Sequence, residues 1–481
     1  MSGDMAFAAG VSRAEAATHG FFQVIDRVRA AVSELATGNG DRARTQRDAL
    51  AAFGVRLASA GLLYLTQIVM ARWIGSHDYG IYVFVWTWVL VLGGLAHLGI
   101  NIVMMRLLPE YRESGDLDRF RALVRGGRVF ALVAGTLVAG FGFAGLWFFG
   151  EHLGGPYILP AYLALVCVPL FALTEVQDGI GRGQAWIWSG LLPPYVLRPL
   201  LVLVAMAAAC LAGLPMTATT AAGAAIAATW GAALIQTVLV NRRLRESLPK
   251  GNHAYDFKAW FKVSLPLVAV SAAELMLQNT DILVISRYLT PTDVAIYFAS
   301  AKTMSLILFV HYAVGSAVAN RFSALNARGD TEQLKAFVRD SVNWTFWPSL
   351  LGAAFILAFG KPLLWLFGPQ FEAGYPVMFI LVIGFLFRSS FGPAETLLSM
   401  LGEHQICAAV LIVTALLNVA LNFALVPAFG LIGAAIATSI SLMTAAILNY
   451  VVAKRRLEIE IAIWRNLPGR DQAAANRQPA E

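Results

Sequence analysis

Long apolar runs alternate with short polar linkers along the chain after residue 49. Each run holds about 20 residues, which is the length that a helix needs to cross the hydrocarbon core of a bilayer. The pattern predicts two sets of six membrane-spanning helices. The first set covers about residues 50–70, 81–105, 129–150, 157–174, 188–212 and 217–240, and the second set covers about 263–285, 294–320, 341–367, 375–400, 405–429 and 431–452.

The composition supports a membrane protein. Hydrophobic residues make up 58% of the 481 residues and charged residues only 14%, whereas a soluble domain carries about 25% charged residues. The net charge of +7 comes from basic residues that gather in the linkers, as membrane topology requires. We therefore expect membrane lipids, and no nucleic acid, as surroundings and partners.

Two phrases occur twice in the same order. Residues 71–82 and 286–297 share Arg, Asp, Ile and Tyr at matching places, and residues 106–124 and 320–338 share Gly-Asp, Ala and Val. Such duplication is common in transporters and predicts one six-helix unit written twice. The expected parts are an N-terminal extension (1–49), a first lobe (50–241), a linker (242–262), a second lobe (263–452) and a C-terminal tail (453–481).

The linker charges predict the orientation. Lys and Arg are concentrated after the second, sixth and eighth spans, so the positive-inside rule places both termini in the cytoplasm. Within the extension, one apolar face is formed by Phe21, Ile25, Val28, Val32 and Leu35. This spacing predicts an amphipathic helix on the membrane surface or against a partner, and a disordered tail with a transient helix is the alternative.

Polar residues interrupt the span at 263–285. Glu274, Gln278 and Asp281 are spaced i, i+4, i+7 and so share one helical face. Each ionised group at bilayer depth costs roughly 2.5–3.5 kcal/mol, so this face should avoid lipid and meet a wet cavity or a neighbouring helix. The two interpretations are a functional stripe and a structural cluster that ties the helix to its neighbours.

Three arginines also lie inside predicted spans. Arg198 and Arg388 lie near the middle of the fifth and tenth spans, and Glu395 follows Arg388 on the same face. These arginines are expected to pair with acids such as Glu274 or Asp281, or to line a cavity where they could grip phosphate. Arg56 lies a turn or two inside the first span, where snorkelling to the interface is an equal alternative.

Other polar residues at span depth are expected to have ordinary packing or interface roles: His97, Asn101, Glu175 and Asp178. The chain contains no HExxH, GxSxG or GxxxxGK[ST] motif. Its three cysteines have no metal-ligand spacing, and its predicted outer loops are too short for a catalytic domain. We therefore expect no enzyme, no metal and no cofactor.

The phrases ARWIGSHDYGIY (71–82), RLLPEYRESGD (106–116) and LQNTDILVISRYL (277–289) resemble the polysaccharide-exporter branch of the multidrug/oligosaccharidyl-lipid/polysaccharide (MOP) flippase superfamily. The resemblance covers about residues 48–456. It implies an all-α polytopic fold with two six-helix lobes around a central cavity. It also implies alternating-access export of a polyprenyl-pyrophosphate-linked oligosaccharide, of the O-antigen or exopolysaccharide type, across the bacterial cytoplasmic membrane.

On this interpretation the candidate site residues fall into two groups. The expected substrate-binding residues are Arg56, Arg198, Arg388, Gln278 and Asn279, and the candidates for ion coupling or gating are Glu274, Asp281 and Glu395. Sodium ions, protons or the membrane potential could drive the cycle, and polysaccharide polymerase or export proteins are candidate partners.

Two alternatives stay open. A drug/cation antiporter of the same fold would use Glu274 and Asp281 for cation exchange, although the mid-membrane arginines repel a cationic substrate. A membrane glycan polymerase or ligase would need a sizeable outer loop with catalytic groups, which the predicted linkers do not provide.

Overall fold

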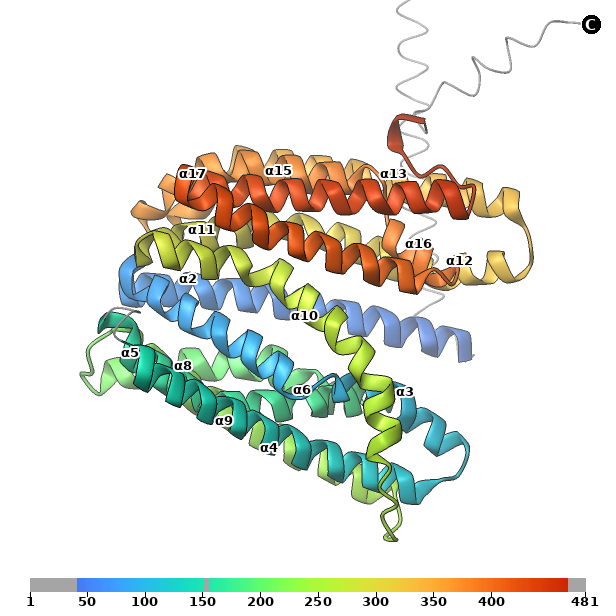
Figure 1. The fold of residues 1–481 in the computed structure, drawn as a ribbon, viewed down its shortest axis with the longest axis horizontal. Coiled ribbons are helices and arrows are strands. Elements are labelled where there is room, and N and C mark those ends of the chain that lie inside the picture. The colour runs from blue at the N-terminus through green and yellow to red at the C-terminus, as the bar shows by residue number, and fades with distance from the viewer. Residues whose placement is uncertain (1–40, 151–154, 466–481) are drawn as a thin grey trace, which may run out of the picture. The chain divides into compact units, whose positions relative to one another are not determined.

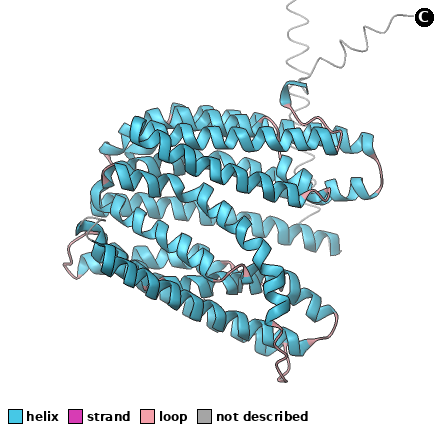
Figure 2. Cartoon of the chain, viewed as in Figure 1, coloured by secondary structure: helices cyan, strands magenta, loops and turns pink. Residues whose placement is uncertain are grey.

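The computed structural model describes residues 41–150 and 155–465, and it describes side chains from residue 58 onward. The described residues form helices joined by loops and turns, without a strand (Figure 2). The chain divides into two compact units, Met1–Ser59 and Ala60–Glu481, and the description below concerns the second. The amphipathic helix predicted at 21–35 and the tail beyond residue 465 lie outside the described residues.

The helices follow one another with few intervening residues (Figure 1). Those before the middle of the chain are α2 (Asp41–Ala96), α3 (Ile100–Glu113), α4 (Leu117–Phe149), α5 (Gly155–Leu165), α6 (Val168–Gly183), α7 (Ile187–Gly190), the π-helical turn η2 (Pro193–Leu197), α8 (Arg198–Leu211) and α9 (Ala218–Ser247).

The remaining helices begin with α10, which starts at Phe257. They are α10 (Phe257–Tyr288), α11 (Pro291–Met304), η3 (Ser305–Ile307), α12 (Leu308–Ala327), α13 (Thr331–Ala358), α14 (Gly360–Trp365), η4 (Pro369–Gly374), α15 (Tyr375–Ser389), α16 (Ala394–Met400), α17 (His404–Arg456) and η5 (Ile463–Arg465).

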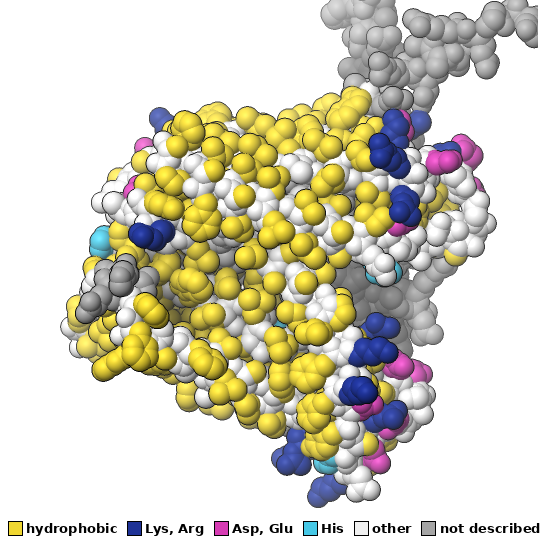
Figure 3. Space-filling view, viewed as in Figure 1, with side chains coloured by type: hydrophobic (Ala, Val, Ile, Leu, Met, Phe, Trp, Pro, Cys, Tyr) yellow, Lys and Arg dark blue, Asp and Glu magenta, His cyan; other side chains and the backbone are white. Residues whose placement is uncertain are grey.

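Within the described residues, eight helices are long and apolar enough to cross a bilayer, and a ninth is added if the bent pair α5 and α6 forms one span. The chain is therefore a multi-pass membrane protein, and large apolar side chains cover the visible face of the described residues (Figure 3). The count is lower than the predicted twelve. Part of the difference arises because some predicted neighbours are continuous in the structure.

Two glycines turn long helices back on themselves. Gly75 in α2 and Gly430 in α17 have φ values of 77° and 58°, a region that glycine adopts without steric cost. After the first turn, the Tyr79 hydroxyl donates to Gln67 Oε1 at 2.7 Å, although the two residues are 12 apart in sequence. Helix α17 therefore contains two of the predicted spans in succession, and α2 contains the first predicted span and most of the second.

Other predicted spans are interrupted. The span predicted at 81–105 breaks between α2 and α3, where Leu98 and Gly99 have positive φ. The span predicted at 375–400 breaks between α15 and α16, at Gly392 and Pro393. A proline removes a backbone donor, and a positive-φ residue leaves the helical region, so each interruption has a local cause.

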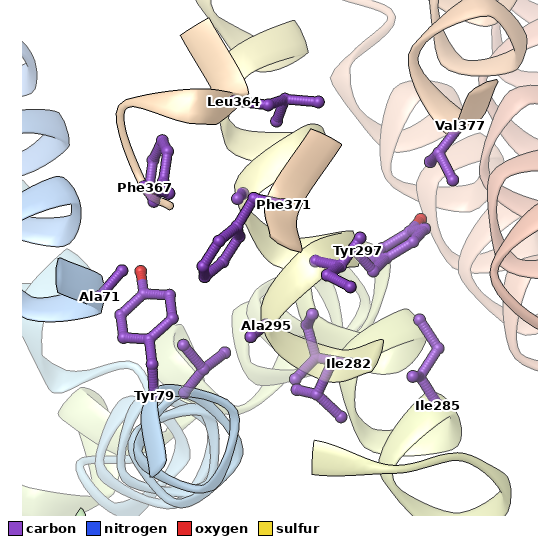
Figure 4. Packing of buried hydrophobic residues seen from close by; sticks show 14 of the residues in the cluster. Ala71, Tyr79, Ile282, Ile285, Ala295, Tyr297, Leu364, Phe367, Phe371 and Val377 are labelled. Carbon is purple, nitrogen blue, oxygen red and sulfur yellow. The ribbon is translucent and has the colours of Figure 1, made fainter. Parts of the chain in front are cut away.

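At one end, the hydrophobic core of the described residues is continuous across the two halves of the chain. There, one cluster joins residues of α2, α8 and α9 to residues of α10, α11, α15 and the α13–α15 connection. Figure 4 shows Tyr79 and Ala71 of α2 facing Phe367 and Phe371, with Ala295 and Tyr297 of α11 beside them. This cluster fastens the two halves together.

At the other end the core is divided. One cluster contains residues of α3, α4, α6, α9 and the start of α10, among them Trp260. A separate cluster contains residues of α12, α13, α16, α17 and the segment after α17, among them Phe322 and Phe391. Lys and Arg side chains gather at this end, and the surface is hollowed between them (Figure 3).

The α17 turn offers a test of the fold. A Cβ atom at Gly433 would lie 2.2 Å from the Leu425 carbonyl oxygen, whereas one at Gly140 of α4 would meet open space. Gly433→Ala should therefore destabilise the protein by about 1–3 kcal/mol, and Gly140→Ala should stabilise it by about 0.5–1 kcal/mol. Thermal unfolding in detergent measures both, and equal effects of the two substitutions would contradict the close packing at the turn.

Candidate functional site

A first group of polar side chains, the α6–α8 cluster, consists of Glu175, Asp178, Arg182, Tyr195 and Arg198. The three α6 residues are spaced i, i+3, i+7, which places them along one helical face. Arg182 Nη2 lies 2.6 Å from Asp178 Oδ2 and donates to the Tyr195 hydroxyl at 3.1 Å. The Asp178 side chain is only 6% exposed and that of Arg182 is 32% exposed, so the carboxylate is shielded from solvent while the guanidinium stays partly accessible.

Arg198 extends the cluster onto aromatic rings. Its guanidinium carbon lies 5.5 Å from the Trp86 ring centre of α2 and 5.3 Å from the Phe171 ring centre of α6. Both distances are within the range of cation–π attraction. The charge of Glu175 contributes to the electrostatic surroundings of Arg198. Arg198 therefore faces α2 and α6 rather than lipid.

The turn before Arg198 has an unusual geometry. Pro193 and Pro194 cannot donate backbone hydrogen bonds, and the Arg198 N–H bonds to the Pro193 carbonyl five residues earlier. This π-helical turn adds a residue to the helical repeat just before Arg198. Such turns occur frequently at functional sites.

A second group, the α15–α16 cluster, consists of Arg388, Glu395, His311 and Glu274. Arg388 Nη2 donates to both carboxylate oxygens of Glu395 at 3.0 Å, across the break between α15 and α16. The Arg388 side chain is 19% exposed and that of Glu395 is 47% exposed. Solvent can therefore reach the Glu395 side of the pair, while the two hydrogen bonds fix the orientation of the Arg388 guanidinium.

The surroundings of this pair carry further charge. His311 of α12 is buried and interacts electrostatically with both Arg388 and Glu395. Glu274 of α10 is exposed, and its carboxylate is repelled by that of Glu395. Arg388 and Glu395, which were predicted to share a face, therefore form a direct ion pair. Glu274 is a second acid in the surroundings of this pair.

The polar stripe predicted on α10 is divided between two environments. Glu274 accepts a hydrogen bond from Gln278 Nε2 at 3.4 Å, beside the α15–α16 cluster. Asp281 instead interacts with Tyr297 and Lys302 of α11, and the Tyr297 hydroxyl lies 3.4 Å from Thr438 Oγ1. We call Asp281, Tyr297, Lys302 and Thr438 the α10–α11 cluster.

The other predicted substrate-binding residues differ in accessibility. Gln278 is exposed, whereas Asn279 is buried and donates to the Leu275 carbonyl of its own helix at 2.8 Å. Asn279 is thus positioned for packing more than for contact with a ligand. Arg56 lies on α2, in the part whose side chains the structure does not describe.

The two mid-span arginines belong to separate clusters. Arg198 faces the Trp86 and Phe171 rings and Arg388 pairs with Glu395, so neither forms the ion pair with Glu274 or Asp281 that the sequence suggested. Glu175 and Asp178, which were expected to have ordinary packing roles, form the acidic side of the α6–α8 cluster. The i, i+3, i+7 spacing of the α6 charges is the sequence signal that could have identified it.

Helix α2 is fastened to the second half of the chain by side chains. Arg72 donates to the carbonyls of Leu366 at 2.8 Å and Trp365 at 2.5 Å, and it stacks on the Trp365 ring. Ser76 Oγ donates to Gln370 Oε1 at 2.5 Å. These bonds satisfy carbonyls at the C-terminal end of α14, beside the core cluster that joins the halves.

No group of three His, Cys, Asp or Glu side chains that could hold a metal ion is found among the residues that the structure describes. The polar groups described above are the α6–α8, α15–α16 and α10–α11 clusters, each surrounded by apolar helices.

Comparison with known families gives the chain its classification. The model of the polysaccharide biosynthesis protein family matches residues 46–324, more than half of the chain. The chain belongs to this family. A second model, MatE, matches residues 266–424, so the two matches together cover residues 46–424.

A curated relative is the probable low-salt glycan biosynthesis flippase Agl15 of Haloferax volcanii. It is 24% identical over 233 residues, which are 47% of this chain and 46% of the relative. The aligned region thus spans about half the length of that relative.

Solved structures share the fold. The inward-facing conformation of a multidrug resistance MATE family transporter of the MOP superfamily has a TM-score of 0.70 at 16% identity, covering 84% of this chain and 98% of that one. The inward closed conformation of the lipid II flippase MurJ has a TM-score of 0.68 at 13% identity, covering 90% and 94%. An outward-facing conformation of a MATE transporter has a TM-score of 0.60 at 16% identity, covering 85% and 95%.

These matches confirm the resemblance to the polysaccharide branch of the MOP superfamily and an all-helical, MATE- and MurJ-like fold.

The α6 ion pair gives a test of the cluster. Asp178→Asn should destabilise the protein by roughly 3 kcal/mol, because it leaves the Arg182 charge without its carboxylate. The double variant Asp178→Asn/Arg182→Gln should recover part of this loss. A double-mutant cycle from thermal unfolding in detergent should give a coupling energy of about 1–3 kcal/mol, and strictly additive effects would contradict the pairing.

Proposed function

We propose that this chain is a flippase that moves a polyprenyl-pyrophosphate-linked oligosaccharide from the cytoplasmic to the outer leaflet by alternating access. The observation that carries the proposal is an arginine inside a span in each half of the chain, Arg198 against two aromatic rings and Arg388 paired with Glu395. The family match and the glycan flippase relative support the substrate class.

The chemistry of the substrate explains why such a protein needs buried charge. A sugar chain cannot cross hydrocarbon unaided, because each unpaired hydroxyl costs several kcal/mol. A pyrophosphate is still more costly, and arginine grips phosphate oxygens through two parallel hydrogen bonds. Arg198 and Arg388 would hold this group, and Glu175 and Glu395 would keep each guanidinium oriented before the substrate arrives.

We propose that the twelve predicted spans form two six-helix lobes around a central cavity. The eight long helices become eleven spans when the α5–α6 pair is added and α2 and α17 are each counted twice. The twelfth would be α13, whose Asn343, Trp344 and Pro348 lower its hydropathy. The cavity would open between the two cores that are separate at the basic end.

The arrangement of the core supports an inward-open state. At the end with few basic residues, the two halves share one hydrophobic cluster. At the end with many basic residues, their hydrophobic clusters are separate. The positive-inside rule assigns the basic end, and with it both termini, to the cytoplasm. The chain would then lie in the bacterial cytoplasmic membrane, closed to the outside, beside polymerase or export proteins that use its product.

The membrane potential offers a driving force. An interior-negative potential favours outward movement of an anion by about 2.3 kcal/mol per charge per 100 mV. Export of the pyrophosphate therefore does not require a coupling ion. Asp281 and Glu274 are our candidates for binding Na⁺ or H⁺ during the return step, with Glu395 as a gating residue whose ion pair must open when Arg388 takes the substrate.

Cation antiport is the second candidate, because the MatE model matches residues 266–424. This region contains Glu274, Asp281 and Glu395, which could exchange a cationic drug for an ion. The positive charges of Arg198 and Arg388 disfavour that substrate. Efflux of a cationic dye from reconstituted vesicles, coupled to protons or sodium, would favour antiport over the flippase.

Substrate transfer should depend on the mid-span arginines. Arg198→Gln and Arg388→Gln should each slow translocation of lipid-linked oligosaccharide in vesicles by about tenfold or more, since each loses a charge-assisted contact with the pyrophosphate. Arg198→Lys should retain part of the rate. The control is Arg287→Gln, at the exposed end of α10, and normal transfer by both glutamine variants would remove the proposed cationic site.

The outer closure should depend on Arg72. Arg72→Gln loses two carbonyl hydrogen bonds and the stacking on Trp365, so the population should shift toward states with that end open. Spin labels at the exposed positions His77 and Lys361, in a variant without native cysteines, should show an added longer distance. Arg287→Gln, at the matching place of the repeat, should leave the distribution unchanged, and an unchanged distribution in Arg72→Gln would contradict this closure.

A further inference from the structure

A pocket near the basic end of the first half has no role in the proposed transport path. It has a volume of about 330 Å³ and lies between α4, the end of α9 and the loop before α10. Three of its lining residues are Arg121, Arg125 and Arg128, at successive turns of α4, and no acidic residue lines it. The pocket is therefore strongly positive.

The arginines are not equally engaged. The guanidinium of Arg121 already has partners within the protein. It pairs with Asp118 and donates hydrogen bonds to the carbonyls of Asn252 and Pro249 at 2.9 Å. Arg125 is exposed and has no hydrogen bond or ion pair within the described part of the chain. Its charge is free to meet a ligand.

Arg128 is partly buried, and only some of its donors are satisfied. Its Nη1 donates to Asn241 Oδ1 of α9 at 2.6 Å, whereas its Nε and Nη2 are buried without a hydrogen-bond partner among the described residues. These two nitrogens form one edge of the guanidinium, the edge that binds two oxygens of a carboxylate or phosphate at once. Leaving buried donors unpaired costs free energy. An anion with two oxygen acceptors would satisfy both nitrogens and remove this cost.

The walls of the pocket are apolar. Val124, Val129, Leu244 and Leu248 line it beside the arginines. Val129 also begins an exposed stripe on α4 that continues through Val133, Leu137 and Phe141, each more than half exposed. Residues spaced by four lie on one helical face, so the stripe leads from the pocket along the apolar part of the span.

We propose that this pocket binds an anionic phospholipid, with its phosphate on Arg125 and Arg128 and an acyl chain along the α4 stripe. The unsatisfied guanidinium edge supplies the specificity for phosphate, and the continuous apolar stripe favours a lipid over a free ion. Basic pockets at the membrane interface have this chemistry in general. The bound lipid would hold the inner ends of α4 and α9 together through the Arg128–Asn241 contact.

Native mass spectrometry of the purified full-length protein in detergent tests the proposal. Phosphatidylglycerol should bind more tightly than phosphatidylcholine. Arg128→Gln should weaken phosphatidylglycerol binding by about tenfold, and Arg125→Gln should weaken it by about fivefold. Arg125 has no structural partner, so its variant keeps the test valid if Arg128→Gln does not fold.

The matched control is Arg119→Gln. Arg119 lies on the same helix, pairs with Asp116 at 3.4 Å and does not line the pocket, so its loss should change binding by less than about twofold. Equal binding of the two phospholipids, or full binding by both pocket variants, would overturn the proposal. Displacement of phosphatidylglycerol by millimolar inorganic phosphate would overturn it too, and would identify a free-phosphate site.

Discussion

The cost of placing charge in hydrocarbon governs this structure. Each ionised group inside a span must find an opposite charge, a hydrogen bond or water, because lipid offers none of these. The described charges at span depth follow this rule in different ways: Asp178 pairs with Arg182, Arg388 pairs with Glu395, and Arg198 lies over two aromatic rings. The charges are therefore held between helices, where a transported anion would also have to pass.

The helix interruptions serve the same arrangement. The break between α15 and α16 allows Arg388 and Glu395, seven residues apart, to meet through a bidentate contact. The double proline before Arg198 produces a π-helical turn in place of a regular one. In both cases a local loss of helical hydrogen bonds accompanies a charged side chain that faces protein. Broken helices are tolerated in membranes only where neighbouring groups compensate for them.

The distribution of the core links packing to movement. A single cluster with Tyr79, Phe371 and Tyr297 joins the two halves at one end, while separate clusters around Trp260 and Phe322 lie at the other. A protein packed in this way can separate its halves at one end without unfolding either of them. Opening the joined end would break the hydrogen bonds of Arg72 and Ser76 together with the apolar contacts of this cluster, so the joined end is the harder one to open.

Much of the fold and part of the site follow from the sequence. Apolar runs of bilayer length predicted the spans, and the spacing of Arg388 and Glu395 along one segment predicted a shared face. The predicted span boundaries also bracket the two helix reversals, because Gly75 lies between the spans predicted at 50–70 and 81–105, and Gly430 lies between those predicted at 405–429 and 431–452.

Only the tertiary structure decided which helices face one another. It placed Arg198 over the Trp86 and Phe171 rings, divided the α10 stripe between the surroundings of Glu274 and Asp281, and brought Arg72 to the carbonyls of Trp365 and Leu366. The reason is physical. Periodicity along a helix reports which residues share a face, whereas the partner of that face is set by packing between helices that are distant in the sequence.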